Sequence, residues 1–275
     1  MAARSAFLIG FTIALLIVGS HAFITRKVGD ADLKFTYSGA TGPDKWASLN
    51  PKFFLCAKGK SQSPIDIVTD KVVVSKKLKP LIRNYHAANV TLVNYKFTVG
   101  IEYPDHTGGI IVGDKEYKLK QMHWHSPSEH RINGIRYAAE QHMVHISDDG
   151  QIAVVATLFK YGHPDPVLSE VHSKLNELAS NNIRSHEAGK ITIGPFYPKE
   201  LRQTSRKYYR YIGSSSIPPC SENLMYLVLG KARSISREQV ESLKAPLDMR
   251  CKNNARPCQP LNGRHVEVYE DHIAP

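Results

Sequence analysis

The sequence has 275 residues, 13 histidines, four cysteines and a formal net charge of +11. It shows no internal repeat, no low-complexity tract and no Gly/Ser-rich linker, which argues against repeat, fibrous and multidomain architectures. The charge would suit nucleic-acid binding. For a chain that enters the secretory route, however, a solvated basic surface explains the basic runs at 76–79 and 206–210 better. We therefore expect one folded domain and no nucleic-acid partner.

The start of the chain has the pattern of a secretory signal peptide. Arg4 precedes an apolar run over residues 6–18, and Ser20-His21-Ala22 has the small-x-small pattern of a cleavage site. The apolar run is shorter than the ~20 residues that a membrane-spanning helix needs. We expect a signal peptide at 1–22, a single domain over 23–275 and no membrane anchor once the signal is removed.

Alternation of apolar and polar residues, which is typical of half-buried strands, predicts much of the secondary structure. Residues 96–103 and 117–125 alternate along their length, and residues 137–146 and 152–160 are interpreted as further strands. Turn signals lie between these segments at Gly108-Gly109, Asn133-Gly134 and Asp149-Gly150. Dense strands joined by such turns favour a mostly antiparallel sheet.

Two helices are expected beside this sheet. Asp165 can cap the first, with Pro166 in its first turn. The apolar stripe of this helix is Val167, Leu168, Val171, Leu175 and Leu178. Ser236 and Gln239 can form a capping box at the start of the second helix. The expected fold class is mainly β (α+β), as a single domain around a sheet with a few peripheral helices.

Three histidines on two neighbouring predicted strands form the strongest functional signal. His123 and His125 point to the same face of a strand, and His142 can join them from the next strand. Three neutral imidazoles without a thiolate or carboxylate suit Zn²⁺ with an open fourth position. Gln121 and Glu140 each lie two residues before one of these histidines, where each could accept the ring's other N–H. From spacing alone, ordinary core or surface histidines stay an open alternative.

The remaining motifs narrow the chemistry and support secretion. The sequence contains no His-Glu-x-x-His motif, no phosphate-cradling glycine loop and no Gly-x-Ser-x-Gly elbow. Four cysteines in a secreted chain predict two disulfides, and spacing alone allows three pairings. Asn89 begins an N-glycosylation sequon, which is consistent with the secretory route.

Several motifs around the histidines carry a resemblance to a known family. They are GPDKW at 42–46, QSPIDI at 62–67, SPSEH at 126–130, PPCSEN at 218–223 and NNARP at 253–257. With the histidine segments, they make the chain similar to α-class carbonic anhydrases of the secreted plant type, from Tyr37 to about Val268. The resemblance implies a single domain around a large twisted, mostly antiparallel sheet, with zinc at the base of a conical cavity.

The resemblance also implies roles for individual residues. The implied ligands of one Zn²⁺ per chain are His123, His125 and His142. The implied partners of these rings are Gln121, Glu140 and the backbone of Asn254. The resemblance further implies a disulfide between Cys56 and Cys220, which would pin a loop near the site, and leaves Cys251 and Cys258 as the second pair.

The implied activity is the reversible hydration of CO₂ to bicarbonate and a proton. In this family, zinc lowers the pKa of its water to about 7. Ser216 would sit beside the metal and donate a hydrogen bond to the buried Glu129, which orients the reacting oxygen. Val144 and Val154 would help form the apolar wall against which CO₂ rests.

Several positions on the substrate side depart from the family pattern. Where the family has Leu-Thr-Thr, this chain has Ser215, Ser216 and Ile217. These residues make the pocket more polar, free the rotamer of the hydroxyl and add a bulky group at the cavity wall. Tyr226 stands where a tryptophan is usual. Phe97 occupies the position of the proton-shuttle histidine and cannot relay a proton, so proton export would depend on water or buffer.

Two functions therefore compete. A working but slow carbonic anhydrase is favoured by the retained histidines and their partners. A non-catalytic storage or binding protein with the same fold is favoured by the changes at Phe97, 215–217 and Tyr226. We prefer the enzyme, with CO₂ and bicarbonate as its small-molecule partners. We expect it in the apoplast or in a plastid reached through the secretory route.

Overall fold

The computed structural model describes residues 34–181, 189–197 and 205–271. The expected signal peptide at 1–22 therefore lies outside the described residues. Within the described ranges, no helix is both long enough and apolar enough to cross a membrane.

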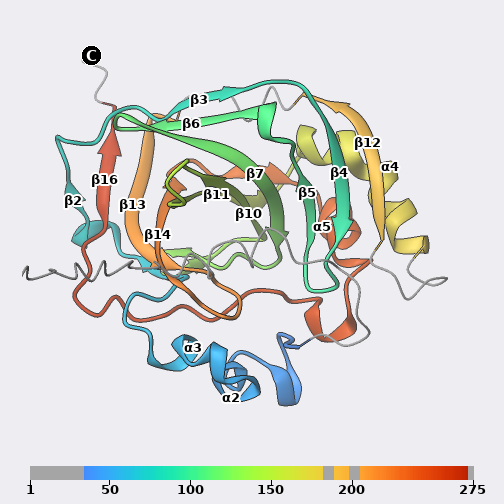
Figure 1. The fold of residues 1–275 in the computed structure, drawn as a ribbon, viewed down its shortest axis with the longest axis horizontal. Helices are drawn as coiled ribbons and strands as arrows, with labels where there is room; N and C mark the ends of the chain where they lie inside the picture. The colour runs from blue at the N-terminus through green and yellow to red at the C-terminus, as the bar shows by residue number, and fades with distance from the viewer. Residues whose placement is uncertain (1–33, 182–188, 198–204, 272–275) are drawn as a thin grey trace, which may run out of the picture.

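Strands dominate the architecture, and the helices are few and peripheral (Figure 1). The strands are β1 Asp66–Ile67, β2 Val73–Val74, β3 Ile82–Tyr85, β4 Ala88–Asn94, β5 Val99–Glu102, β6 Gly108–Val112, β7 Lys115–His125, β8 Arg131–Ile132, β9 Ile135–Arg136, β10 Ala139–Ile146, β11 Ile152–Tyr161, β12 Lys190–Phe196, β13 Lys207–Ser214, β14 Glu222–Leu229, β15 Arg233–Ile235 and β16 Glu267–Glu270. The α-helices are α2 Trp46–Leu49, α3 Leu55–Lys58, α4 Pro166–Asn181 and α5 Arg237–Lys244. Short 3₁₀ turns are η1 Gly39–Thr41, η2 Pro51–Phe53, η3 Thr69–Lys71, η4 Asp105–Thr107 and η6 Met249–Cys251.

A 13-stranded sheet organises the molecule, with the order β12-β4-β5-β7-β10-β11-β14-β13-β16-β2 along its main path. Strands β3, β6 and β15 attach beside this path. Most neighbours are antiparallel, whereas β11 pairs in parallel with β14 and β15, and β16 pairs in parallel with β2. The sheet is strongly twisted, and α4 and α5 lie together on one side of it (Figure 1). This arrangement confirms the expected fold class.

The predicted strands are present, with shifts at their ends. Strands β7, β10 and β11 cover most of the segments expected at 117–125, 137–146 and 152–160. The strand expected at 96–103 is shorter, because Asn94 pairs with Val99 and the residues between them form a hairpin loop. Asn133 and Gly134 both have positive φ, as a two-residue hairpin turn requires.

Both predicted helices begin at the expected caps. The backbone N–H of Leu168 donates to Oδ1 of Asp165 at 3.2 Å, at the start of α4. At α5, the Ser236 hydroxyl accepts from the backbone of Gln239, and the Gln239 side chain accepts from the backbone of Ser236. These bonds satisfy N–H groups that an uncapped helix start would leave unpaired.

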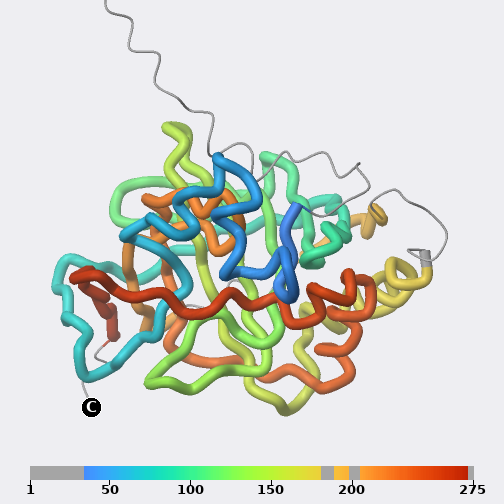
Figure 2. The backbone as a smooth tube through the Cα atoms, turned by 90° about the horizontal axis from the view of Figure 1, so that it is seen from below, coloured from blue at the N-terminus to red at the C-terminus, as the bar shows by residue number. Residues whose placement is uncertain are grey.

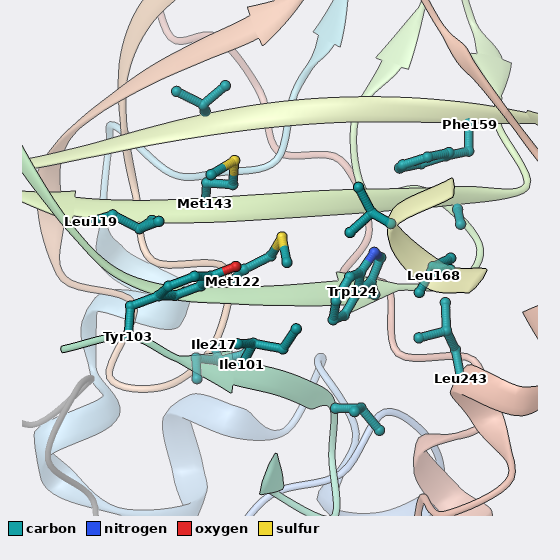
Figure 3. Close-up of a cluster of buried hydrophobic side chains, with 14 of the residues drawn as sticks. Ile101, Tyr103, Leu119, Met122, Trp124, Met143, Phe159, Leu168, Ile217 and Leu243 are labelled. Carbon is teal, nitrogen blue, oxygen red and sulfur yellow. The ribbon is translucent and has the colours of Figure 1, made fainter. Parts of the chain in front are cut away.

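Hydrophobic side chains form two clusters on the two faces of the strand core. The larger cluster includes Met122 and Trp124 of β7, and α4 and α5 cover it with residues such as Leu168 and Leu243 (Figure 3). The smaller cluster includes Val144 and other side chains of β10, β11, β13 and β14. Alternation along β7 and β10 therefore points one set of residues into the large cluster and leaves the histidine set on the opposite face.

The segment between α5 and β16 crosses one side of the molecule to reach the edge of the sheet (Figure 2). It holds Asn254 and Arg256, both of which are buried. This crossing brings two residues from near the end of the chain to the side chains of β7 and of the loop that follows it.

Candidate metal centre

The register of β7 and β10 brings the three predicted histidines together. The two strands are antiparallel, with His142 opposite His123 and Glu140 opposite His125. The three imidazoles are almost fully buried, and each offers a nitrogen within 4.8 Å of those of the other two. Their ring centroids lie 4.8 to 5.2 Å apart. A cation placed between them would be within reach of all three rings.

Hydrogen bonds fix which nitrogen of each ring faces this point. Nδ1 of His123 donates to Oε1 of Gln121 at 3.1 Å, and Nδ1 of His125 donates to the backbone oxygen of Asn254 at 2.6 Å. For His142 it is Nε2 that lies 2.6 Å from Oε1 of Glu140. The other nitrogen of each ring is thereby left as the one that can bind a metal. The three partners expected from the sequence all lie at these rings.

The protonation of the rings suits metal binding. Burial lowers the pKa of His123 well below its usual range, and the neighbouring His125 and His142 lower it further. Burial also lowers the pKa of His125. Burial opposes a charge on His142 too, but Glu140 outweighs this effect and raises the pKa of that ring. Two of the rings are thus neutral near pH 7, and at His142 a cation at Nδ1 could take the place of the second proton while the N–H at Nε2 stays bonded to Glu140.

Two buried polar atoms at the centre have no hydrogen-bond partner among the described residues. They are Nε2 of His125 and Oε2 of Glu129, which lie 3.5 Å apart. Oε2 of Glu129 is also 4.0 Å from Nδ1 of His142. Unpaired buried polar atoms are costly, and here they gather where three imidazole nitrogens converge. A set of three nitrogen donors beside a carboxylate fits Zn²⁺.

Glu140 connects this centre to a buried polar network that the sequence did not reveal. Its Oε1 also accepts from Nδ1 of His130 at 2.6 Å, and its Oε2 accepts from the backbone N–H groups of Glu129 and His130. Nε2 of His130 lies 2.6 Å from the hydroxyl of Tyr211, which is 2.8 Å from the hydroxyl of Ser63. His130 lies on a loop, so strand alternation could not place it. The sequence signal that could have indicated His130 was its position within the family motif at 126–130.

A narrow pocket opens beside the histidines. It is lined by His123, His142, Val144, Ile152, Val154, Ser215, Ser216, Leu224 and Tyr226. Ile152 and Leu224 were not anticipated, although each lies two residues before an expected wall residue on the same strand face. Tyr226 closes the pocket with its ring 5.8 Å from that of His142, and its hydroxyl donates to the backbone oxygen of Ser214. The pocket is therefore mainly apolar beside the ring nitrogens.

The loop after β13 is held by hydrogen bonds between Ser215 and Ile217. The hydroxyl of Ser215 donates to the backbone oxygen of Ile217 at 2.9 Å and accepts from its backbone N–H at 3.3 Å. The side chain of Ile217 packs in the larger hydrophobic cluster and is not among the residues that line the pocket. The local turn directs this apolar side chain into the core, and its expected place on the cavity wall stays a prediction. Ser215 does border the pocket, but its hydroxyl is already hydrogen-bonded to the loop.

The expected hydrogen bond from Ser216 to Glu129 is also absent from the described contacts. Oε1 of Glu129 accepts from the backbone N–H of Arg256 at 2.9 Å, whereas its Oε2 has no partner. Ser216 is buried and lines the same pocket as His123 and His142. The sequence did not indicate Arg256, because its contact with Glu129 spans 127 positions of the chain.

The cysteines follow the expectation for one pair and contradict it for the other. The disulfide between Cys56 and Cys220 is present and confirms the expected pairing. Cys251 and Cys258 are free thiols, so the second pair was wrong. Cys251 is buried in the larger hydrophobic cluster, whereas the sulfur of Cys258 points to the backbone oxygen of Glu129 at 3.5 Å. Burial raises the pKa of Cys251 to about 12 and that of Cys258 to about 11, so both stay protonated near neutral pH.

Phe97 lies outside the pocket, in the hairpin loop between β4 and β5. Its ring stacks near Tyr95 at 6.0 Å and packs against Phe35 at 5.1 Å. It therefore belongs to an aromatic group at the edge of the larger cluster. The expected glycosylation site, Asn89, is exposed on β4.

Comparisons with known proteins agree with this geometry. The family model of eukaryotic-type carbonic anhydrases matches residues 41–270. Alpha carbonic anhydrase 7 of Arabidopsis thaliana is 37% identical over 261 residues, which cover 94% of this chain and 93% of the relative. Dioscorin DB3S of Dioscorea polystachya is 35% identical over 256 residues, with 93% and 94% coverage.

Solved structures of related proteins have the same fold. A dioscorin complexed with ascorbate has a TM-score of 0.83 at 36% identity and covers 87% of this chain and 99% of its own. The α-carbonic anhydrase of Thermovibrio ammonificans, in complex with sulfanilamide, has a TM-score of 0.75 at 35% identity, with coverage of 87% and 100%.

Proposed function

Because the chain belongs to the family of eukaryotic-type carbonic anhydrases, we propose that it catalyses the zinc-dependent, reversible hydration of CO₂ to bicarbonate and a proton. One observation carries the proposal: three buried imidazoles converge beside an apolar pocket, and one nitrogen of each ring is bonded to a partner outside their common centre. A purely structural set of histidines would have no need to leave three ring nitrogens facing one another.

We assign one Zn²⁺ per chain to His123, His125 and His142. When bound, such an ion acts as a Lewis acid and lowers the pKa of a bound water to about 7, the value established for this class of enzyme. Glu140 holds the ring of His142 by accepting its N–H and is itself held by two backbone N–H groups. Gln121 orients His123 in the same way. Rigid partners of this kind keep metal ligands in place.

The residues of the pocket suit a small apolar substrate. Val144, Val154, Ile152 and Leu224 present hydrocarbon next to the histidines. CO₂ has no hydrogen-bond donor, so it can lie against such a wall without leaving polar groups unpaired. Glu129 would remain a hydrogen-bond acceptor next to the metal position.

Proton release is the step that we expect to be slow. The phenyl ring of Phe97 cannot accept a proton, and it packs among aromatic side chains away from the pocket. Protons would therefore leave through water or buffer, and turnover should be lower than in members that carry a histidine there.

A second candidate is a non-catalytic storage or binding protein on the same fold. The observation that favours it is the missing hydrogen bond between Ser216 and Glu129, together with the aromatic burial of Phe97. The similarity to dioscorins makes this candidate worth testing alongside the enzyme. It predicts zinc binding without CO₂ hydration.

The route through the secretory pathway is part of the proposal. The Cys56–Cys220 disulfide and the plant relatives are consistent with it. We propose the apoplast, or a plastid reached by this route, as the final location, and Asn89 as a glycosylation site. No nucleic acid or membrane anchor is needed for the proposed activity, and CO₂ and bicarbonate are its small-molecule partners.

Stopped-flow CO₂ hydration by the zinc-loaded mature chain, over a range of buffer concentrations, tests the proposal. The enzyme should show activity above background that rises with imidazole buffer. The His142→Ala variant, as the matched control, should stay at background. Background activity of the zinc-loaded wild type at every buffer concentration would refute the enzyme and leave the binding protein.

A further inference from the structure

Gly100 leaves a space at the metal centre that another side chain fills. It pairs with His123 across β5 and β7, so a side chain at position 100 would point to the face that holds the histidines. A Cβ atom there would lie 2.9 Å from Cε2 of Tyr95 and 3.4 Å from Nε2 of Gln121. The ring of Tyr95 and the amide of Gln121 thus meet in the space above Gly100.

The hydroxyl of Tyr95 has a fixed direction. It donates to Oε1 of Glu102 at 2.8 Å, and Nζ of Lys190 donates to the other carboxylate oxygen at 3.1 Å. Glu102 pairs with Gln121 across the strands, so both side chains lie on this face. The Gln121 amide nitrogen lies beside the Tyr95 ring above Gly100, close enough for the amide to interact with the phenol oxygen. Because the phenol proton goes to Glu102, the phenol oxygen is left to accept from the amide nitrogen of Gln121.

This arrangement determines which end of the Gln121 amide faces His123. An amide presents an oxygen at one end and an NH₂ group at the other, and its neighbours decide which way it lies. With its nitrogen held by Tyr95, the Gln121 oxygen accepts from Nδ1 of His123. The reversed amide would present NH₂ to Nδ1 and favour the tautomer that has its proton on the metal-facing nitrogen.

We propose that Tyr95 is a positioning residue that acts through Gln121 to hold His123 in its metal-binding tautomer. The sequence analysis did not find it, because Tyr95 lies in a hairpin loop outside the strand alternation. The inference rests on the proposed zinc site and adds a residue for which the family resemblance gave no role.

Tyr95→Phe is the variant that tests this role, because it keeps the ring and removes the hydroxyl. The readout is the rate at which the zinc-loaded mature protein loses its metal to an excess of EDTA. We expect release about 3- to 10-fold faster than in the wild type, less than the 10- to 100-fold effect typical of a direct partner of a ligand. Gln121→Ala supplies that direct-partner reference. The visible spectrum of the Co²⁺-substituted protein should differ from that of the wild type slightly in Tyr95→Phe and more strongly in Gln121→Ala.

Tyr103→Phe is the matched control. Tyr103 also has a buried hydroxyl, but this one has no hydrogen-bond partner among the described residues and lies in the larger hydrophobic cluster. Its removal should leave zinc release unchanged. The melting temperatures of the two metal-free Tyr→Phe variants control for an effect on stability. If these temperatures are equal, faster zinc release from Tyr95→Phe alone indicates a positioning role.

The outcomes separate this inference from the proposed function. If Gln121→Ala speeds release and Tyr95→Phe does not, the role of Tyr95 is wrong and the zinc site stands. If the wild type binds no zinc, the zinc site fails and the positioning role fails with it. Should Tyr95→Phe not fold, Glu102→Ala replaces it. Without that acceptor the phenol is free to donate to the Gln121 oxygen, so faster release is again expected and a wild-type rate would overturn the inference.

Discussion

The metal side and the loop side of the site are built in different ways. On the metal side, the register of β7 and β10 fixes the histidines, and each ring has a hydrogen-bond partner. On the loop side, Ser215 bonds to its own turn, Ile217 packs into the core and Glu129 keeps an unpaired oxygen. The metal side therefore has three imidazoles that could hold a metal, whereas the loop side makes its hydrogen bonds within its own turn and leaves Glu129 without a second partner.

The largest effect is expected when one of the proposed ligands is removed from the metal side. His142→Ala leaves two imidazoles, which make an incomplete zinc site. We expect the purified variant to hold well under one zinc per chain by atomic absorption. His106→Ala, which changes an exposed histidine outside the metal centre, should keep the wild-type content. Full zinc content in His142→Ala would remove that residue from the ligand set.

The disulfide tests whether the two sides are independent. Cys56 and Cys220 are 164 positions apart, and opening so long a loop should lower the free energy of unfolding by about 2–5 kcal/mol. We expect the double Ser variant to unfold at lower urea but to keep its zinc, because no ligand lies in the pinned loop. Cys258→Ser, which changes a free thiol, should leave stability nearly unaltered. Loss of zinc from the folded double variant would show that the two sides are coupled.

A second histidine of β10, His145, allows the strands of the metal side to be tested by changing the pH. His145 is buried, with Nε2 at 2.9 Å from the Tyr85 hydroxyl, and burial lowers its pKa to about 3. The unfolded chain takes up this proton near pH 6.5 and the folded chain does not. Stability should therefore fall as the pH drops from about 6.5 toward 3, by up to about 1.4 kcal/mol per pH unit.

Urea unfolding of the metal-free protein at several pH values measures this slope. His145→Gln removes the titrating group, so its stability should depend less steeply on pH than that of the wild type. Equal slopes for the two proteins would mean that His145 does not titrate as its burial indicates.

Phe97→His tests the proton-transfer part of the loop side. An imidazole there would supply a group that titrates near pH 7, and we expect CO₂ hydration in dilute buffer to rise about 10-fold. The gain should shrink as imidazole buffer is added, since buffer then carries the proton. Phe97→Leu should not produce the gain. No change in Phe97→His would mean that the residue at position 97 does not limit proton transfer.

The smallest effect is expected from Ser216→Thr. The added methyl restricts the rotamers of the hydroxyl, so it should spend more time directed at Glu129. Turnover in saturating buffer should rise about 2- to 3-fold, with unchanged zinc content. A gain that appears only in dilute buffer would instead indicate an effect on proton export.

Local sequence patterns determined much of what was found. Alternation placed His123 and His125 on one face, and the caps at Asp165 and Ser236 marked the starts of both long helices. Spacing also suggested Gln121 and Glu140 as partners of the rings, and the family motifs added Asn254 and the Cys56–Cys220 pair. These features were readable because each depends on residues close in sequence or on a motif specific to the family.

Only the tertiary structure decided the rest, because it depends on contacts between distant segments. The free nitrogen of His125 is set by Asn254, 129 positions away, and the unpaired oxygen of Glu129 by Arg256, 127 positions away. The burial of Ile217 and the two free thiols likewise follow from packing that no local pattern encodes. Alternation and capping are set by the backbone within a few residues, whereas the hydrogen bonds that select a tautomer form only when the chain closes on itself.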